Sequence, residues 1–263
     1  MDLQLKSKTA FISGSTQGIG FAIAKQLLAE GAKVIINGRT QKKIDLAIQS
    51  LIREIPGADV SGIAADFSQT ESVNELLAKR PNIDILINNV GIFELKPFTE
   101  ITDQDWTHIF EVNVMSGIRL SRQLLPKMLE RKWGRIIFIS SESAINIPEN
   151  MIHYGMTKTA MLSVSSGLAK LTKNTEVTVN TILGGPTYSD GVAETVTQIA
   201  SAQNQEVEQV KNYIINSFNP SSLLQRFIDP SEIANLAVYL SSPLSIATNG
   251  SSVRADGGVL PTI

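Results

Sequence analysis

Short apolar runs alternate along this chain with longer segments in which apolar residues recur at helical spacing. The runs of strand length lie at residues 9–12, 34–36, 60–65, 83–87, 135–139, 177–182 and 252–254. Helical spacing occupies residues 19–30, 41–54, 71–79, 103–131 (one or two helices), 154–173, 190–218 (two short helices) and 230–241. Apolar strands that alternate with helices are typical of a parallel sheet covered on both faces. The pattern therefore predicts an α/β fold, a doubly wound sheet of about seven strands with helices on both faces.

The composition supports a single globular domain. The chain has 263 residues, of which 43% are hydrophobic and 18% charged, so it can bury a sizeable core. No linker, repeat or low-complexity stretch divides it, and we expect one domain over residues 1–263. The net charge of -2 argues against a nucleic-acid partner, which a basic face would bind.

Several classes of site and location are disfavoured by what the sequence lacks. It contains no cysteine, which excludes disulfides, thiolate catalysis and zinc–thiolate sites. Its two histidines, His108 and His153, are far apart, and we expect no metal site. No apolar run approaches the length of a membrane span, and the start of the chain lacks a signal-peptide pattern. We expect a cytoplasmic protein without a membrane partner.

A glycine-rich turn follows the first predicted strand. Residues 13–20 read Ser-Gly-Ser-Thr-Gln-Gly-Ile-Gly, with glycines at 14, 18 and 20. Such a turn lets the backbone approach a pyrophosphate, and the following helix offers free N–H groups to the anion. Three glycines in eight residues could also form only a tight loop, but the position between a strand and an amphipathic helix favours cofactor binding.

The end of the second predicted strand indicates which dinucleotide would bind. An acidic residue there would accept a hydrogen bond from the adenosine ribose of NAD(H), whereas an arginine would pair with the 2′-phosphate of NADP(H). The sequence reads Asn37-Gly38-Arg39-Thr40, with no acid. Arg39 could be an ordinary surface residue, but the pattern favours NADP(H), with NAD(H) as the alternative.

Together with motifs further along, these residues resemble the short-chain dehydrogenase/reductase family over nearly the whole chain, from Lys8 to Gly258. The matching motifs are the glycine turn, Asp66-Phe67, Asn88-Asn89-Val90-Gly91, Asn113, Ser141, Tyr154-x-x-x-Lys158, and Gly185-Pro186-Thr187 with Ser189. Val90 and Gly184 stand where the family usually has Ala and Pro. The chain also resembles the 3-oxoacyl-[acyl-carrier-protein] reductase-like members.

The resemblance implies a Rossmann-type fold, a nucleotide site and a carbonyl/alcohol oxidoreductase. The cofactor-binding residues that it implies are Gly14, Ser15, Thr16, Gln17, Gly18, Ile19, Gly20, Arg39, Asp66, Phe67, Asn88, Val90, Gly91, Tyr154, Lys158, Gly185, Pro186, Thr187 and Ser189.

The implied catalytic residues are Asn113, Ser141, Tyr154 and Lys158. Tyr154 and Lys158 are four residues apart and would share one helix face. Tyrosine has an ordinary pKa near ~10, which a neighbouring ammonium lowers. The resemblance implies that Tyr154 exchanges the proton, Lys158 lowers its pKa and holds the nicotinamide ribose, Ser141 orients the substrate oxygen, and Asn113 supports a water linked to Lys158.

The substrate is left open. In the family, the segment at about 188–226 covers the substrate, and here its spacing fits either an amphipathic cover or a mobile lid. We favour a small-molecule carbonyl/alcohol substrate. One alternative is a 3-oxoacyl thioester on a carrier protein, for which Arg131 and Lys132 could contribute a basic patch. Another is a catalytically inactive NADP-binding regulatory protein.

The resemblance also implies a homo-oligomer, a tetramer or dimer. Relatives pair through two long helices, here about 105–131 and 154–173, and through the last strand. Apolar residues on the second helix could serve such an interface or the core.

Overall fold

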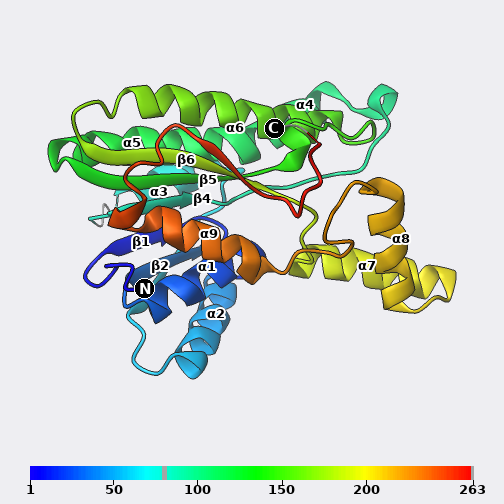
Figure 1. Cartoon of the computed structure of the whole chain (residues 1–263), viewed down its shortest axis with the longest axis horizontal. Helices are drawn as coiled ribbons and strands as arrows, with labels where there is room; N and C mark the ends of the chain where they lie inside the picture. Colours follow the sequence, from blue (N-terminus) through cyan, green and yellow to red (C-terminus); the bar gives the residue numbers. More distant parts are fainter. Residues whose placement is uncertain (79–81, 262–263) are drawn as a thin grey trace.

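The computed structural model describes residues 1–78 and 82–261 (Figure 1). Its strands form one seven-stranded parallel sheet in the order β3-β2-β1-β4-β5-β6-β7. The strands are β1 (Thr9–Ile12), β2 (Lys33–Gly38), β3 (Val60–Ala64), β4 (Ile85–Asn88), β5 (Trp133–Ser141), β6 (Glu176–Gly184) and β7 (Ser252–Ala255). The strand order reverses between β1 and β4, which confirms the predicted doubly wound, Rossmann-type sheet.

Helices cover both faces of this sheet. The helices are α1 (Gly18–Ala29), α2 (Gln41–Glu54), α3 (Thr70–Ala78), α4 (Asp103–Phe110), α5 (Ser116–Glu130), α6 (Ile152–Lys170), α7 (Asp190–Gln203), α8 (Val207–Phe218) and α9 (Pro230–Ser241). In Figure 1, α1, α2 and α9 lie below the sheet, whereas α5 and α6 lie above it. No helix in the described part of the chain is both long and apolar enough to cross a membrane.

The inner strands β1, β2, β4, β5 and β6 are mostly apolar because both of their faces are buried, whereas the edge strands β3 and β7 are partly exposed. Successive residues of a strand point to opposite faces, and here each face has its own core cluster. Ile12 of β1 and Ile139 of β5 belong to the cluster beneath α1 and α9. Their neighbours Phe11 and Phe138 belong to the cluster beneath α5 and α6. Each of these two strands therefore contributes apolar side chains to both core clusters.

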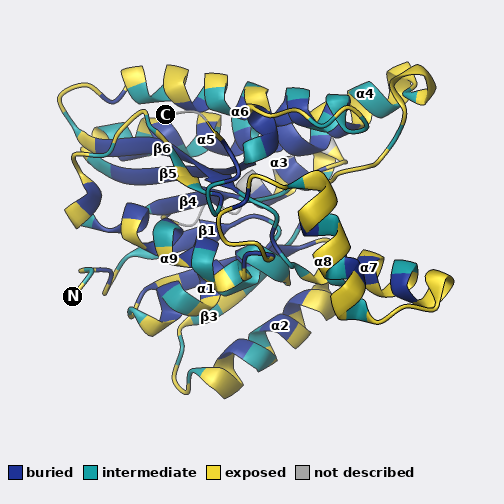
Figure 2. Ribbon diagram, turned by 45° about the vertical axis from the view of Figure 1, so that its right-hand side comes forward, coloured by how far each residue is buried: buried dark blue, intermediate teal, exposed yellow. Residues whose placement is uncertain are grey.

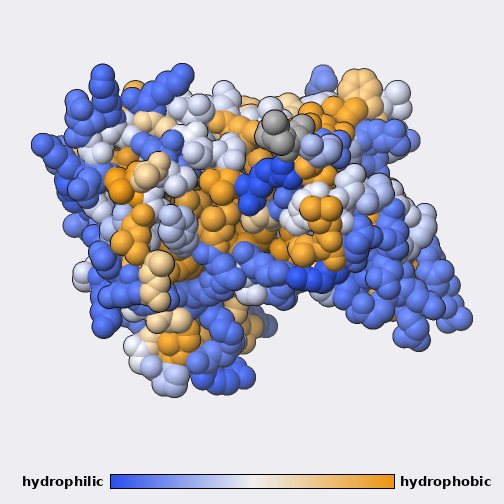
Figure 3. Space-filling view, viewed as in Figure 1, coloured by the Kyte–Doolittle hydropathy of each residue, from blue (hydrophilic) through white to orange (hydrophobic). Residues whose placement is uncertain are grey.

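The helices α7 and α8 project from the main body and pack against each other (Figures 1 and 2). Val196 and Ala200 of α7 and Val210 of α8 form a small apolar cluster of their own. In Figure 3 the outer surface of this pair is hydrophilic, and hydrophobic side chains gather where the pair joins the body. We call residues 188–226, which contain both helices, the covering segment.

Most predicted element boundaries lie within two or three residues of those observed. One region contains a type of helix that was not predicted. The predicted 103–131 region is two helices joined by a turn of π-helix at Glu111–Met115. Helix α6 begins at Ile152, two residues before its predicted start, and ends three residues early at Lys170. The end of the predicted 71–79 helix, Lys79, lies outside the described residues.

Candidate active site

The loops that carry the predicted site residues meet at one edge of the sheet. All seven strands are parallel, so their carboxyl ends lie on the same side. The glycine turn follows β1, Arg39 follows β2, Val90 and Gly91 follow β4, and Ser141 ends β5. This edge, next to the reversal of strand order, is where open α/β sheets bind their ligands.

The glycine turn has the backbone conformation that its sequence predicts. Gly14 and Gly18 have φ angles of 61° and 60°, in the left-handed region that favours glycine. Gly20 is required for a different reason: a Cβ there would lie 2.6 Å from the Gly14 carbonyl oxygen and 2.5 Å from Nδ2 of Asn89. Helix α1 can therefore approach the turn only if residue 20 has no side chain. Thr16, Gln17 and Ile19 remain at least partly exposed along this turn.

Amide side chains hold the turn in place. The Oδ1 atom of Asn37, at the end of β2, accepts a hydrogen bond from the Gly14 amide at 2.9 Å. The Nδ2 atom of Asn89, after β4, donates to the Gly14 carbonyl at 2.8 Å. Neither residue was among the predicted site residues, although each is an amide at the end of a buried strand. Their bonds fix the loop before any ligand binds.

Two predicted cofactor residues use their side chains inside the protein. Ser15 is fully buried, and its hydroxyl donates to the Ile12 carbonyl at 2.7 Å and accepts from the Asn37 amide at 2.9 Å. Phe67 is buried in the cluster beneath α5 and α6. A cofactor could contact these two residues only through their backbones.

The amino end of α1 already holds an anion. The Gly18 amide donates to Oδ2 of Asp190 at 2.6 Å, and Asp190 is the first residue of α7. A helix amino terminus offers free N–H groups to negative charge, which is the property a pyrophosphate needs. The carboxylate stands where phosphate oxygens would lie, and the Gly18 amide donates to it. The neighbouring Ser189 also adjoins the turn, since a Cβ on Gly18 would lie 3.4 Å from its Cβ.

Arg39 and Asp66 lie close enough to interact at the ends of β2 and β3. Burial works to raise the pKa of Asp66, but hydrogen bonds from Ser68 and the charge of Arg39 hold that pKa below its usual value. The Ser68 amide and hydroxyl donate to Asp66 Oδ1 at 2.9 and 2.7 Å. Arg39 itself is exposed, and so is free to reach a ligand at this edge.

Ser141, Tyr154 and Lys158 come together beneath this edge. Ser141 lies close enough to Tyr154 to affect the pKa of its phenol. The Lys158 ammonium lies 5.5 Å from the centroid of the Tyr154 ring and donates to the Ile139 carbonyl at 3.0 Å. Phe93 packs edge-on against the Tyr154 ring, with centroids 6.4 Å apart. Ser141, Tyr154 and Lys158 thus lie close together.

The ionisation of Tyr154 differs from what its spacing to Lys158 predicts. Burial raises the pKa of Tyr154, the negative charge of Glu142 raises it further, and the hydrogen bond with Ser141 lowers it. Burial likewise lowers the pKa of Lys158 to about 8, against the opposing effect of Glu142. The pKa of Tyr154 therefore lies above its ordinary value, because burial and the charge of Glu142 outweigh the effect of Ser141.

Glu142 is a site residue that the sequence analysis missed. It follows Ser141, whose hydroxyl donates to Oε2 of the Glu142 carboxylate. The Ser143 hydroxyl donates to Oε1 at 3.3 Å. Burial raises the pKa of Glu142, partly offset by hydrogen bonds, chiefly that from Ser141. An acid directly after a serine at a strand end was the only signal available in the sequence.

Asn113 lies in the π-helical turn and is fully buried. Its Nδ2 donates to the Ile92 carbonyl at 2.9 Å and to the Thr157 hydroxyl at 3.0 Å, and its Oδ1 accepts from the Ile92 amide at 2.8 Å. A Cβ on Gly91 would lie 3.4 Å from Lys158 Nζ and 3.7 Å from Asn113 Oδ1. Gly91 therefore separates the two polar groups, and single π-turns are frequent at functional sites.

Asn88 and Val90, at and after the end of β4, lie beside the glycine turn. Asn88 is buried, and its Nδ2 donates to the Ser121 hydroxyl at 3.2 Å. Val90 adjoins the glycine turn, since a Cβ on Gly14 would lie 3.0 Å from Cγ2 of Val90. Asn88 supports the loop from below, whereas Val90 is partly exposed beside it.

The loop after β6 runs beside the site. Gly184 ends β6 and pairs in register with Ser141, so the replacement of the usual proline leaves this strand intact. Gly185 approaches the backbone of Asp256 so closely that a Cβ would lie 2.6 Å from its carbonyl oxygen. Pro186 and Thr187 follow, and the Thr187 hydroxyl donates to the Gly185 carbonyl at 2.9 Å.

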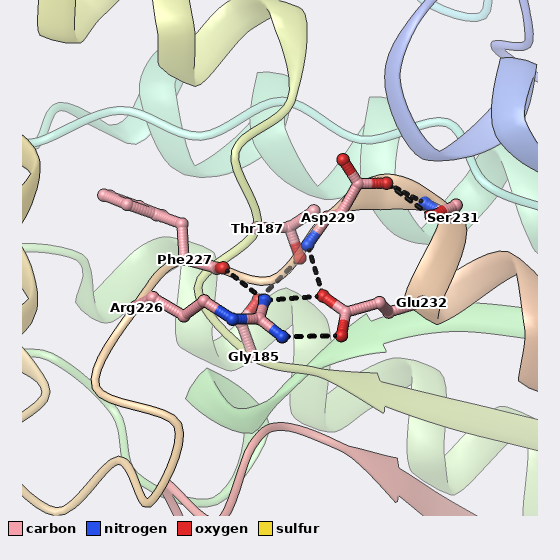
Figure 4. Close-up of polar contacts among 7 residues, drawn as sticks. All are labelled: Gly185, Thr187, Arg226, Phe227, Asp229, Ser231 and Glu232. Carbon is pink, nitrogen blue, oxygen red and sulfur yellow. Dashed lines mark hydrogen bonds and ion pairs between the residues drawn. The ribbon is translucent and has the colours of Figure 1, made fainter.

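The two ends of the covering segment are fastened together at its base. Ile228 pairs with Thr187 as a parallel bridge, and its amide donates to the Pro186 carbonyl at 2.8 Å. Arg226 forms a two-pronged ion pair with Glu232 of α9, with bonds of 2.7 and 2.9 Å (Figure 4). The bonds from Arg226 and from the Asp229 amide lower the pKa of Glu232 to about 2. Movement of α7 and α8 would therefore hinge at this fastened base.

The basic residues considered for a carrier-protein patch lie away from the site. Arg131 and Lys132 precede β5, whose opposite end carries Ser141. The Arg131 guanidinium donates to Asn82 Oδ1 at 3.0 Å and to the Ile83 carbonyl at 2.7 Å. They supply no positive charge at the edge where the catalytic groups gather.

Comparisons with known proteins bear on the family and the fold. The profile of the family described as short chain dehydrogenase matches residues 8–200. The chain is 45% identical to the uncharacterized oxidoreductase YvaG of Bacillus subtilis (strain 168), with 100% of both proteins covered. It is 46% identical to the uncharacterized oxidoreductase YvrD of the same strain, again over 100% of each. The structure of L-sorbose reductase from Gluconobacter frateurii, complexed with NADPH and L-sorbose, aligns with a TM-score of 0.94 at 29% identity over 100% of both chains.

Proposed function

Because this chain belongs to the short-chain dehydrogenase/reductase family, and therefore to the NAD(P)-dependent oxidoreductases, we propose that it transfers hydride between NADP(H) and a small carbonyl or alcohol substrate. The observation that carries the proposal is the meeting of Ser141, Tyr154 and Lys158 at the strand edge that bears the glycine turn. A protein that only bound nucleotide would have no need of this set.

Several contacts support a dinucleotide as the resident cofactor. The turn would hold its pyrophosphate through Gly18 and the residues around it, where Asp190 now supplies an anion. Lys158 and the loop at Gly185–Ser189 would hold the nicotinamide end. When bound, the cofactor supplies or accepts the hydride at the substrate carbon.

The protein residues handle the oxygen and its proton. In reduction, the Ser141 hydroxyl orients the substrate carbonyl, and Tyr154 gives its phenolic proton to the oxygen as the carbon gains hydride. In oxidation, Tyr154 takes the proton back. Lys158 stabilises the phenolate that remains through the positive charge of its ammonium. Asn113 holds the loop at Ile92 beside Lys158 and supports proton return through water.

Two features support NADP(H) over NAD(H). Arg39 is exposed at the end of β2, where no acidic residue stands to accept from a ribose hydroxyl. The L-sorbose reductase with a matching fold was determined in complex with NADPH. A guanidinium pairs with a phosphate through two parallel hydrogen bonds, which an unmodified ribose cannot provide.

Binding and activity can be tested in one series. NADPH and NADH are titrated against the wild-type protein and Arg39→Met, and a panel of ketones and aldehydes is then screened for NADPH oxidation. We expect NADPH to bind at least about 10-fold more tightly than NADH in the wild type, and the preference to shrink in the variant. Equal or tighter NADH binding would overturn the cofactor assignment. Tight NADPH binding without turnover on any carbonyl would favour the regulatory alternative.

We also propose a homo-oligomer, a dimer or tetramer, assembled through α5, α6 and β7. Leu171, directly after α6, is 60% exposed, which leaves apolar surface at that end of the helix. Sedimentation analysis of the purified protein gives the assembly state directly.

A further inference from the structure

Glu142 places a negative charge at the centre of the proposed reaction without a part in hydride or proton transfer. Its carboxylate accepts from the Ser141 hydroxyl on one oxygen and from the Ser143 hydroxyl, at 3.3 Å, on the other. The charge acts on both Tyr154 and Lys158. An acid so close to the reacting groups bears directly on which substrates the cleft accepts.

The hydrogen bond from Ser141 to Glu142 creates a conflict when a substrate binds. A serine hydroxyl has a single proton to donate. The Ser141 hydroxyl donates to Glu142, and the Ser143 amide donates to the Ser141 oxygen at 3.1 Å. If Ser141 turns its proton to the substrate oxygen, Glu142 loses its stronger donor. A partly buried carboxylate without that donor disfavours the complex unless the substrate supplies a replacement.

The replacement donor has to lie next to the reacting oxygen. Two groups that each hydrogen-bond to one hydroxyl oxygen, at roughly 2.7 Å, are no more than about 5.5 Å apart. The Ser141 hydroxyl donates its hydrogen bond to the Glu142 carboxylate before the substrate binds and to the substrate oxygen afterwards. A hydrogen-bond donor on the substrate carbon adjacent to the carbonyl can reach the Glu142 carboxylate across this distance. A donor on a more distant carbon could reach it only if the substrate chain folded back.

The surroundings favour a neutral donor. Apolar side chains lie beside the site: Phe93 packs against the Tyr154 ring and Ile147 lies against Gly155, and both are about half exposed. Lys158 already brings an ammonium within range of the Glu142 charge, and a second cation from the substrate would meet repulsion from it. A hydroxyl satisfies the carboxylate without adding charge.

We propose that Glu142 selects substrates with a hydroxyl group on the carbon next to the carbonyl, so that the enzyme reduces α-hydroxy ketones and oxidises vicinal diols. This inference rests on the proposed function and deepens it. Glu142 is the specificity-determining residue: it accepts a hydrogen bond from the substrate hydroxyl while Ser141 and Tyr154 engage the carbonyl oxygen.

The test compares hydroxyacetone, acetone and aminoacetone as substrates with NADPH. These ketones differ only in the group on the adjacent carbon. We expect the wild type to show kcat/KM roughly 10- to 100-fold higher for hydroxyacetone than for acetone, with most of the difference in KM. Aminoacetone, largely protonated near neutral pH, should fall below hydroxyacetone.

Two variants and a control assign the preference to the carboxylate. Glu142→Leu should bring the ratio of kcat/KM for hydroxyacetone to kcat/KM for acetone close to one, because activity on hydroxyacetone is lost. Turnover of acetone should stay the same or rise. Glu142→Gln keeps the shape of the side chain and one acceptor oxygen, so it should show an intermediate ratio. This variant replaces the leucine variant in the test if the latter does not fold. Glu149→Gln, an exposed acid on the same connection, removes a charge and should leave the ratio unchanged.

The outcomes separate this inference from the proposed function. Equal kcat/KM for hydroxyacetone and acetone in the wild type would overturn the role of Glu142 and leave the reductase proposal standing. A wild-type preference that survives in Glu142→Leu would also overturn it. A preference for aminoacetone would show that the carboxylate recognises cations instead. Wild-type protein that binds NADPH but reduces none of the three ketones would count against both proposals.

Discussion

Lys158 should make the folded protein less stable at neutral pH than it would be without this charge. The residue is 5% exposed, and burial lowers its pKa from 10.5 to about 8. A shift of this size corresponds to roughly 3 kcal/mol of lost stability when the ammonium is protonated in both states. Lys158→Met keeps the length of the side chain and removes the charge. It also removes the hydrogen bond to the Ile139 carbonyl, worth about 1 kcal/mol, so we expect a net gain of about 1–2 kcal/mol at pH 7.

The pH dependence identifies the cause. Between about 8 and 10.5 the unfolded chain binds more protons at this residue than the folded chain, because only the folded pKa is lowered. The stability of the wild type should therefore rise with pH over this window, relative to Lys158→Met, and the gain of the variant should disappear. Below pH 8 the gap should be constant.

Urea unfolding of ligand-free protein at pH 7 and pH 9.5, at one protein concentration, measures both effects. Lys173→Met, at an exposed position on the same connection to β6, is the matched control and should change stability by less than about 0.5 kcal/mol. A Lys158→Met variant that is less stable than wild type at pH 7, or whose gain is the same at both pH values, would refute the reasoning.

Three further predictions concern the cofactor loop and the covering segment. Gly20→Ala should weaken NADPH binding at least ~10-fold, because its Cβ would lie closer than 3.0 Å to backbone atoms. Gly191→Ala, whose Cβ would have no atom within 4 Å, should leave binding unchanged, and an NADPH titration of both variants tests this. Asp190→Asn should tighten NADPH binding by roughly 5-fold, since it removes a charge that competes with pyrophosphate at the Gly18 amide; weaker binding would show that Asp190 assists the cofactor. Arg226→Met should speed amide hydrogen exchange in residues 187–226 with little change in global unfolding; unchanged exchange would mean that the ion pair does not fasten the segment.

The sequence predicts most of the sheet well because the strands β1, β2, β4, β5 and β6 are buried on both faces. Phe11 and Ile12 are adjacent, yet they serve opposite cores, which leaves the apolar run unbroken and easy to recognise. The π-helical turn was missed because it shifts backbone hydrogen bonds by one residue without a visible change in apolar spacing. Phe67 is among the predicted cofactor-binding residues, and its apolar side chain lies in the core, which leaves its backbone for such a contact.

The candidate site was predicted as a set of motifs rather than as a network. Positions of Ser141, Tyr154 and Lys158 follow from local spacing on a strand and a helix. Contacts between distant segments do not, as with the bond between Asp190 and the Gly18 amide, 172 residues apart. The raised pKa of Tyr154 could not be predicted either, because it depends on burial and on a neighbouring charge that only the folded chain brings near.

The central claim is that Tyr154 delivers the proton in an NADPH-dependent carbonyl reduction. The direct test is the rate of NADPH oxidation by wild type and Tyr154→Phe with hydroxyacetone, beside an NADPH titration of each. We predict that the variant binds NADPH within about 3-fold of wild type and loses at least ~100-fold in kcat/KM. Turnover by Tyr154→Phe at the wild-type rate would contradict the account.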